Sequence, residues 1–118
     1  MTGTTTSRER VPSLSKVVSK VVVMKGDEVS AVQSLLQDQD TLVVSIAPTG
    51  SKVEDEANYE ATYLTTARNL VKVLNQSPKV KQVIYLSSCS VYGDRQGDWV
   101  TESSTVAPFE RRSQVLHE

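Results

Sequence analysis

The chain has few of the residues that build metal centres, disulfides and nucleic-acid surfaces. Its 118 residues include one cysteine, one histidine, five glycines and four prolines. A single cysteine excludes an internal disulfide, and one cysteine with one histidine is too few for a His/Cys metal cluster. The net charge of −1 and the pI of about 5.8 lack the basic excess of a nucleic-acid binder. No apolar run approaches the roughly 20 residues of a membrane-spanning helix. We therefore expect neither nucleic acid nor a membrane as a partner.

What remains is typical of a soluble globular domain with a core of Val, Leu and Ile, since 38% of residues are apolar and 5% are aromatic. The Thr/Ser-rich, basic segment 1–26 has two interpretations. It resembles an organelle transit peptide, or it is a strand end followed by a solvated helix. The second interpretation is favoured because the segment fits the pattern that follows it. Compartment stays open between cytoplasm and plastid.

Short apolar runs alternate with longer amphipathic stretches. The β-branched run at 21–24 predicts a strand buried on both faces, and two more strands are expected at 41–47 and 80–86. Helices are expected at 28–37, from about 54 to 75, and at 110–118. This alternation predicts an α/β fold with a parallel sheet and helices on both faces.

Two helix starts carry capping residues. Asp27 is expected to cap the first helix, and Ser51 with Glu54 forms a capping box for the second. The second helix carries small and apolar residues at helical spacing, which predicts its buried face: Ala57, Ala61, Leu64, Ala67, Val71 and Leu74.

Small polar residues stand at 3–8, which we interpret as the end of a strand that begins before the chain does, and after each of the three expected strands, at 26–27, 47–50 and 87–90. Because the carboxyl ends of parallel strands meet at one edge of a sheet, we expect these segments to cradle an extended polar ligand.

Residues 87–94, Ser-Ser-Cys-Ser-Val-Tyr-Gly-Asp, resemble the Ser-Ser-x-x-Val-Tyr-Gly signature of the extended short-chain dehydrogenases, the NAD-dependent epimerase/dehydratase family. Glu102 and Pro108 are similar to that family's downstream acid and proline. The resemblance implies a Rossmann-type domain and a catalytic role for Ser88, which would polarise a substrate oxygen. It also implies a substrate such as a nucleotide sugar for a complete version.

The resemblance further implies NAD or NADP as cofactor. The implied contacts follow the strand ends: Thr4, Thr5, Arg8, Asp27, Ala47, Pro48, Thr49, Gly50 and Ser87. In this interpretation Asp27 meets the adenine amino group, and Arg8 favours the 2′-phosphate of NADP. Two structural alternatives stay open. In the first, Thr4, Thr5 and Arg8 belong to a frayed terminus instead of a cofactor site. In the second, Ser87 and Ser88 satisfy backbone groups at a strand end instead of facing a ligand.

The chain departs from the family pattern in two places. No two glycines fall two or three residues apart, so the G-x-x-G-x-x-G turn that seats a pyrophosphate cannot be written. The residues four positions after the tyrosines are Tyr63, Ala67, Cys89 and Gln96, so the Tyr-x-x-x-Lys pair is absent. We therefore expect residues 1–118 to be a single partial, atypical NAD(P)-binding domain, truncated at its N-terminus and catalytically incomplete.

In the Rossmann strand order 3-2-1-4-5 the first strand is the central one, and it carries the glycine-rich turn that this chain lacks. Losing that strand would leave a gap in the sheet and two unpaired strand edges. Two alternatives follow. The chain is a non-catalytic module that pairs or forms homo-oligomers through these edges, or it is a fragment of a longer reductase or epimerase that starts upstream. Cys89 is expected to be a small buried hydrophobe, and Trp99 to cover the edge of the core.

Overall fold

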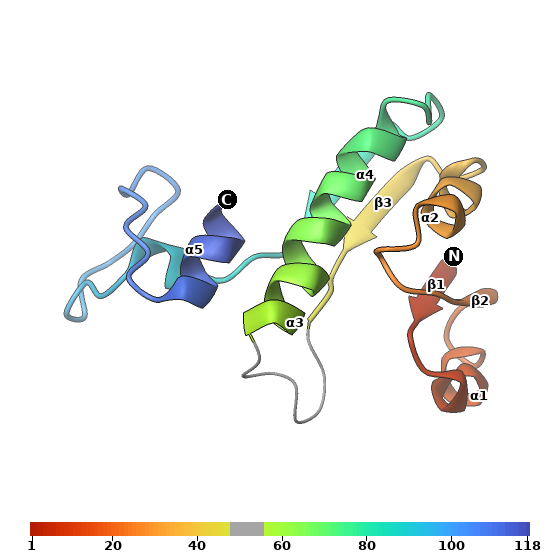
Figure 1. Ribbon diagram of the computed structural model, residues 1–118, viewed down its shortest axis with the longest axis horizontal. Coiled ribbons are helices and arrows are strands. Elements are labelled where there is room, and N and C mark those ends of the chain that lie inside the picture. The colour runs from red at the N-terminus through yellow and green to blue at the C-terminus, as the bar shows by residue number, and fades with distance from the viewer. Residues whose placement is uncertain (48–55) are drawn as a thin grey trace.

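The computed structural model describes residues 1–47 and 56–118 (Figure 1). In chain order the elements are β1 (Thr2–Thr5), a 3-10 turn (Arg8–Arg10), α1 (Val11–Leu14), β2 (Lys20–Val23), α2 (Val29–Leu36), β3 (Thr41–Val44), α3 (Glu56–Glu60), a π-helical segment (Ala61–Thr65), α4 (Thr66–Leu74), β4 (Gln82–Tyr85), a 3-10 turn (Cys89–Tyr92) and α5 (Arg111–His117). The predicted α/β fold is confirmed, and each predicted strand and helix has its counterpart.

The strands form two separate parallel pairs. β1 pairs with β2, with Thr2 opposite Lys20, and β3 pairs with β4, with Thr41 opposite Gln82. Among residues 1–47 and 56–118, no ladder joins β1 to β3. In these two-stranded sheets every strand has one edge without a strand partner in the described part, and we call those of β1 and β3 the open edges. The predicted gap in the strand order is confirmed.

Helices α2 and α4 supply the centre of the core. Val32, Leu36 and Val73 are 1–2% exposed and pack together. Half-buried apolar residues surround them: Met24, Val29, Leu42, Leu70, Leu74 and Val80. The prediction that the strand at 21–24 is buried on both faces is wrong, because β2 lies at the edge of a two-stranded sheet and Val23 is 40% exposed.

The long helix runs from Glu56 to Leu74 but contains a π-helical segment. A π turn adds a residue to the turn, which rotates the following side chains by roughly one position, about 100°, around the helix axis. The buried side chains are consequently Thr66 and Val73, whereas Val71, predicted to be buried, is 63% exposed. Ala57 and Ala61 are exposed as well, so the predicted face is wrong at these three residues, whereas Leu64, Ala67 and Leu74 are half-buried.

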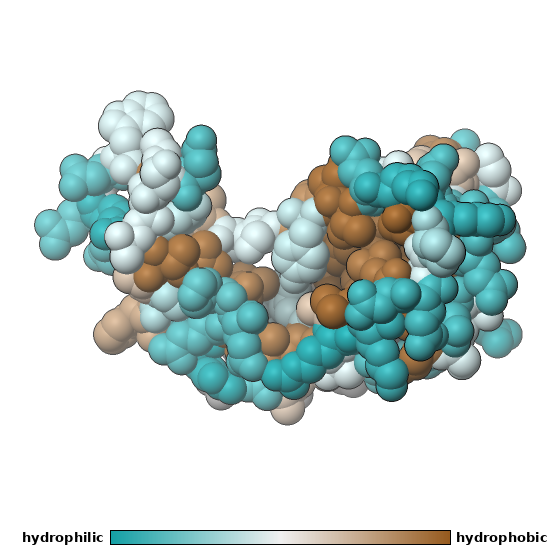
Figure 2. Space-filling view, turned by 90° about the horizontal axis from the view of Figure 1, so that it is seen from above, coloured by the Kyte–Doolittle hydropathy of each residue, from teal (hydrophilic) through white to brown (hydrophobic). Residues whose placement is uncertain are grey.

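Helix α5 closes the C-terminal part against the long helix. It contacts α3 and the π-helical segment. Arg68 pairs with Glu118 at 2.7 Å, and Arg111 pairs with Glu60, both on the surface. Seen from above, hydrophobic surface gathers in the hollowed middle of the molecule between hydrophilic margins (Figure 2). No helix in the described ranges combines the length and the apolar character needed to cross a membrane.

Candidate functional site

The carboxyl ends of the paired strands lie side by side. Thr5 is opposite Val23, and the Met24 N–H donates to the Thr5 carbonyl at 2.9 Å, which continues the pairing past the strand ends. In the second pair Val44 is opposite Tyr85. The segments that follow β1 and β2 are therefore neighbours, as are the segments that follow β3 and β4.

At the end of β1, Thr5 is occupied by the local turn. Its Oγ1 accepts the Ser7 N–H at 3.1 Å and donates to the Ser7 carbonyl at 3.3 Å. Thr4 and Arg8 are exposed. The alternative that these residues fray is wrong for the two threonines, because β1 is paired with β2 over its whole length.

At the end of β2, the carboxylate of Asp27 is exposed. Helix α2 begins after Glu28, and no side-chain hydrogen bond caps it, so the prediction that Asp27 caps this helix is wrong. The N-cap position is occupied by Glu28, so Asp27 stands one residue before it. Asp27 and Arg8 thus sit on adjacent segments with their charged groups open to solvent.

Gly26, beside Asp27, is fixed by α4. The Asn69 Nδ2 group donates to the Gly26 carbonyl at 3.0 Å. A Cβ at Gly26 would lie 2.2 Å from Thr66 Oγ1 and 2.5 Å from Thr66 Cγ2. Only glycine allows this approach between the turn and the helix. The sequence reasoning missed Thr66 and Asn69, because their role appears only once α4 is placed against the turn.

The residues after β3 and β4 are placed as follows. Ala47 is exposed, whereas Pro48, Thr49, Gly50 and the Ser51–Glu54 box lie outside the described residues. Ser87 and Ser88 are both exposed. Ser88 Oγ accepts the Ser90 N–H at 3.2 Å and so caps the 3-10 turn. Its hydroxyl proton is not used in that bond, so Ser88 can still donate to a ligand oxygen.

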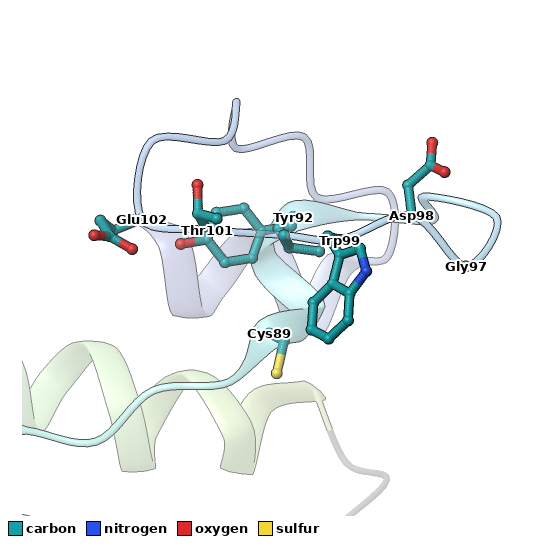
Figure 3. Close-up of a pocket in the computed structure, with 8 residues that line it drawn as sticks. Cys89, Tyr92, Gly97, Asp98, Trp99, Thr101 and Glu102 are labelled. Atoms are coloured by element: carbon teal, nitrogen blue, oxygen red, sulfur yellow. The ribbon is translucent and has the colours of Figure 1, made fainter.

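Beyond this turn lies a cavity of about 530 Å³, drawn in Figure 3. We call it the Trp99 pocket. It is lined by Cys89, Tyr92, Gly97, Asp98, Trp99, Val100, Thr101 and Glu102. Two predictions are wrong here. Cys89 is exposed, and Trp99 is 98% exposed, because the segment after Gly93 extends away from the core instead of folding over it.

Three tyrosines gather where the long helix meets β4. The rings of Tyr59 and Tyr63 have centroids 4.7 Å apart. Burial raises the pKa of Tyr59, Tyr63 and Tyr85 above the ordinary value of 10.0, and nearby Arg112 opposes the rise at Tyr59. These phenols hold their protons at neutral pH. None is therefore a ready base of lowered pKa, in keeping with the absence of a lysine four residues on.

The sequence profile of the NAD dependent epimerase/dehydratase family matches residues 2–114. The chain belongs to this family. No curated protein sequence matches the chain. The family is described as NAD dependent, which agrees with the nicotinamide cofactor that the sequence predicts.

Solved structures agree on the fold. A UDP-Glc/GlcNAc 4-epimerase from Campylobacter jejuni matches 94% of this chain with a TM-score of 0.76 at 19% identity. A UDP-glucose-4-epimerase from Stenotrophomonas maltophila, with bound NAD and formylated UDP-arabinopyranose, has a TM-score of 0.76 at 14% identity over 94% of this chain. A short-chain dehydrogenase/reductase superfamily protein from Agrobacterium tumefaciens with bound NAD covers 98%, with a TM-score of 0.73 at 16% identity.

This epimerase/dehydratase-family chain spans only part of those proteins. It covers 35% of each of the two epimerase chains and 41% of the Agrobacterium chain. At these identities the likeness shows the Rossmann-type fold.

Proposed function

We propose that residues 1–118 act as one domain whose β1 and β2 ends bind the adenosine part of NAD(P) in an epimerase/dehydratase-type protein. The observation that carries the proposal is the exposed Asp27 carboxylate on the segment next to exposed Arg8, after two paired parallel strands. Ligands of open α/β sheets bind beyond the carboxyl ends of the strands. A carboxylate accepts from the adenine amino group, and a guanidinium pairs with a 2′-phosphate, which supports NADP over NAD.

The fit to the rest of the cofactor is incomplete. A dinucleotide pyrophosphate sits on a glycine-rich turn at a helix N-terminus. The described glycines nearest each other, Gly93 and Gly97, lie in the segment after β4, and the sequence has no pair at the required spacing. The residues present therefore fit an adenosine phosphate and do not fit the diphosphate.

The proposed role of Ser88 is to orient a substrate oxygen. Its hydroxyl follows β4, caps the turn through Oγ and keeps a proton to donate. A nucleotide sugar is the substrate class we propose for a complete assembly, because the Campylobacter and Stenotrophomonas structures are UDP-sugar epimerases. Tyr59, Tyr63 and Tyr85 have raised pKa values, so proton abstraction from a sugar hydroxyl would need a further group.

The test uses ligands that need no diphosphate seat: adenosine 2′-monophosphate and adenosine 5′-monophosphate, with calorimetry or ligand-observed NMR. Arg8→Gln should weaken the 2′-phosphate ligand about tenfold and leave the 5′ ligand unchanged. Asp27→Asn should weaken both. Arg10→Gln is the matched control, because Arg10 is exposed in the same turn. Equal losses with Arg8→Gln and Arg10→Gln would leave only a general charge effect and refute the site.

A second candidate is supported by the open edges. β1 and β3 each have one edge without a strand partner in the described part, and such edges accept strands from another chain. In this proposal the protein pairs with a second copy or with a relative through added strands. Light scattering across a concentration series checks it. A monomer at every concentration, still binding adenosine 2′-monophosphate, would reject this candidate and keep the first.

A further inference from the structure

The outer side of β4 is an apolar strand edge that lies in water. β4 pairs with β3 along one side, and in the described ranges no strand pairs with its other side, which we call the β4 edge. Its apolar side chains are 43–51% exposed: Val83, Ile84, Tyr85 and Leu86. The β4 edge is separate from the open edges of β1 and β3. An exposed apolar strand with unpaired backbone groups is a template for another strand.

The ladder with β3 determines which backbone groups of β4 point outward. The Leu86 N–H donates to the Val44 carbonyl at 3.0 Å, and the Gln82 N–H donates to the carbonyl just before β3 at 3.3 Å. In a parallel pair, every second residue of a strand bonds to the same neighbour. The residues between these donors therefore turn their N–H and carbonyl groups away from β3. Val83 and Tyr85 are the two residues in that position, and their backbone groups stand on the β4 edge.

These outward groups match the β4 edge of a second copy in one antiparallel register. When the two Ile84 residues face each other across a two-fold axis, Val83 of each copy lies opposite Tyr85 of the other. Residues in such a pair exchange both N–H···O=C bonds. The register therefore uses the outward groups of Val83 and Tyr85 in both copies. The contact is also closed, because each copy presents the same patch to the other.

The side chains of β4 suit the same register. Tyr85 would lie beside Val83 of the second copy, and pairs of an aromatic and a β-branched residue stabilise antiparallel sheets. The two Ile84 side chains would meet on the opposite face in a non-hydrogen-bonded pair, in which side chains come closest. Both contacts cover apolar surface that a single copy leaves in water.

Charge favours self-pairing at β4 over the outer edge of β2. Lys20 begins β2 and Lys25 follows it, so each end of that strand carries a base. Two such edges in antiparallel contact bring lysines of the two copies together, which opposes pairing. At β4 the bases all precede the strand, the last of them at Lys81, and residues 82–93 carry no charge. In the register above, Lys81 faces the uncharged Ser87 of the second copy.

We propose that two copies of this chain pair antiparallel through their β4 edges, with Ile84 at the two-fold axis. The two β3–β4 sheets then form one continuous sheet across the axis. The proposal does not depend on the adenosine site at β1 and β2, because none of the residues that it uses belongs to that site.

A disulfide cross-link tests the register. With Cys89 replaced by serine, Ile84→Cys places two thiols in a non-hydrogen-bonded pair, where Cα atoms lie about 4.5 Å apart and a disulfide can form. Leu86→Cys is the matched control, because it is exposed on the same face but lies opposite Gln82 of the second copy. After mild oxidation we expect a covalent dimer of Ile84→Cys, by non-reducing electrophoresis and intact mass, and a largely monomeric Leu86→Cys. No cross-link of Ile84→Cys, or equal cross-linking of both variants, would overturn the proposal.

A charge at the axis tests the contact without a cysteine. Light scattering across a concentration series should show a dimer of the unmodified chain. Ile84→Lys should weaken dimerisation about tenfold or more, because two like charges would then face each other. Val43→Lys is the control, since Val43 is 57% exposed and lies opposite Ile84 in β3, one strand away from the axis. Circular dichroism checks that both variants keep the fold.

Two outcomes of the scattering series contradict the proposal. A monomer at every concentration would refute self-association altogether. A dimer that persists in Ile84→Lys would assign the association to another surface, such as the open edges of β1 and β3. Neither experiment uses a nucleotide, so the results are independent of adenosine binding.

Discussion

Replacing Gly26 by alanine tests how the turn after β2 is held against α4. The added Cβ would lie 2.2, 2.5 and 2.8 Å from Oγ1, Cγ2 and Cβ of Thr66. Thr66 is 8% exposed and β-branched on a helix, so its side chain has little freedom to rotate away. Among the described glycines, the left-handed φ angles belong to Gly93 and Gly97, so the backbone at Gly26 suits alanine. Any loss of stability therefore comes from the contact.

The expected loss follows from two opposing effects. Overpacking a tight contact costs about 1–3 kcal/mol. Alanine in place of glycine restricts the unfolded chain and returns about 0.4–1 kcal/mol. We expect Gly26→Ala to lower the free energy of unfolding by about 1.3 kcal/mol, the middle of the first range less the middle of the second. Adding Thr66→Ala removes the two shorter contacts and leaves the one at 2.8 Å, so the double variant should recover part of the loss.

The assay is urea unfolding followed by far-ultraviolet circular dichroism, because Trp99 is already in water and its fluorescence reports little on the core. The cycle comprises Gly26→Ala, Thr66→Ala and the double variant, with Gly97→Ala as a control. Gly97 has a φ of +87° and nothing within 4 Å of its added Cβ, so its cost is backbone strain alone and Thr66→Ala should not relieve it. Additive effects of Gly26→Ala and Thr66→Ala would refute the contact.

Three further outcomes follow from the structure. Leu36→Ala should lower the free energy of unfolding by about 3 kcal/mol, since Leu36 is 1% exposed, whereas Val71→Ala, at an exposed position, should change it by less than about 0.5 kcal/mol in the same urea series. Glu118→Gln should cost less than about 1 kcal/mol, because its 2.7 Å pair with Arg68 lies on the surface, and 0.5 M salt should abolish the difference. With the pKa values of Tyr59, Tyr63 and Tyr85 raised by burial, the folded state keeps its phenol protons when the unfolded state releases them. Stability should then fall as the pH rises above about 10, while phenolate absorbance in the folded protein appears later than in urea; coincident titrations would refute this.

The sequence predicted the elements well because local patterns determine them. β-branched runs gave the strands, and helical periodicity gave α2, the long helix and α5 within a few residues. It also predicted the open edges, through the missing glycine-rich turn. The buried face of the long helix could not be predicted, since a π turn shifts the register without altering the spacing of apolar letters.

The site was harder to predict than the fold. Thr4, Arg8, Asp27 and Ser88 were singled out as polar residues at strand ends, and the structure places all four there with exposed side chains. The exposure of Trp99 was not predictable, because whether the loop after β4 folds over the core depends on contacts between residues distant in sequence, such as the bond from the Ala107 N–H to the Val91 carbonyl. Hydrophobicity alone favours burial of a tryptophan.

The two strand pairs are held together by helices, since no ladder joins them in the described ranges. Val32 and Leu36 of α2 meet Val73 of α4, and the Gln33 amide donates to Gln76 at 3.4 Å. The Asn69–Gly26 bond and the packing of Thr66 against Gly26 reach the turn carrying Asp27. The proposed adenosine site is thus positioned by α4, which belongs to the β3–β4 half. Asn69→Ala should lower the free energy of unfolding by about 1 kcal/mol. Under conditions in which the variant is still fully folded, that loss does not change binding. We therefore expect any weaker binding of adenosine 2′-monophosphate there to come from the displaced turn. Unchanged affinity would separate the site from α4.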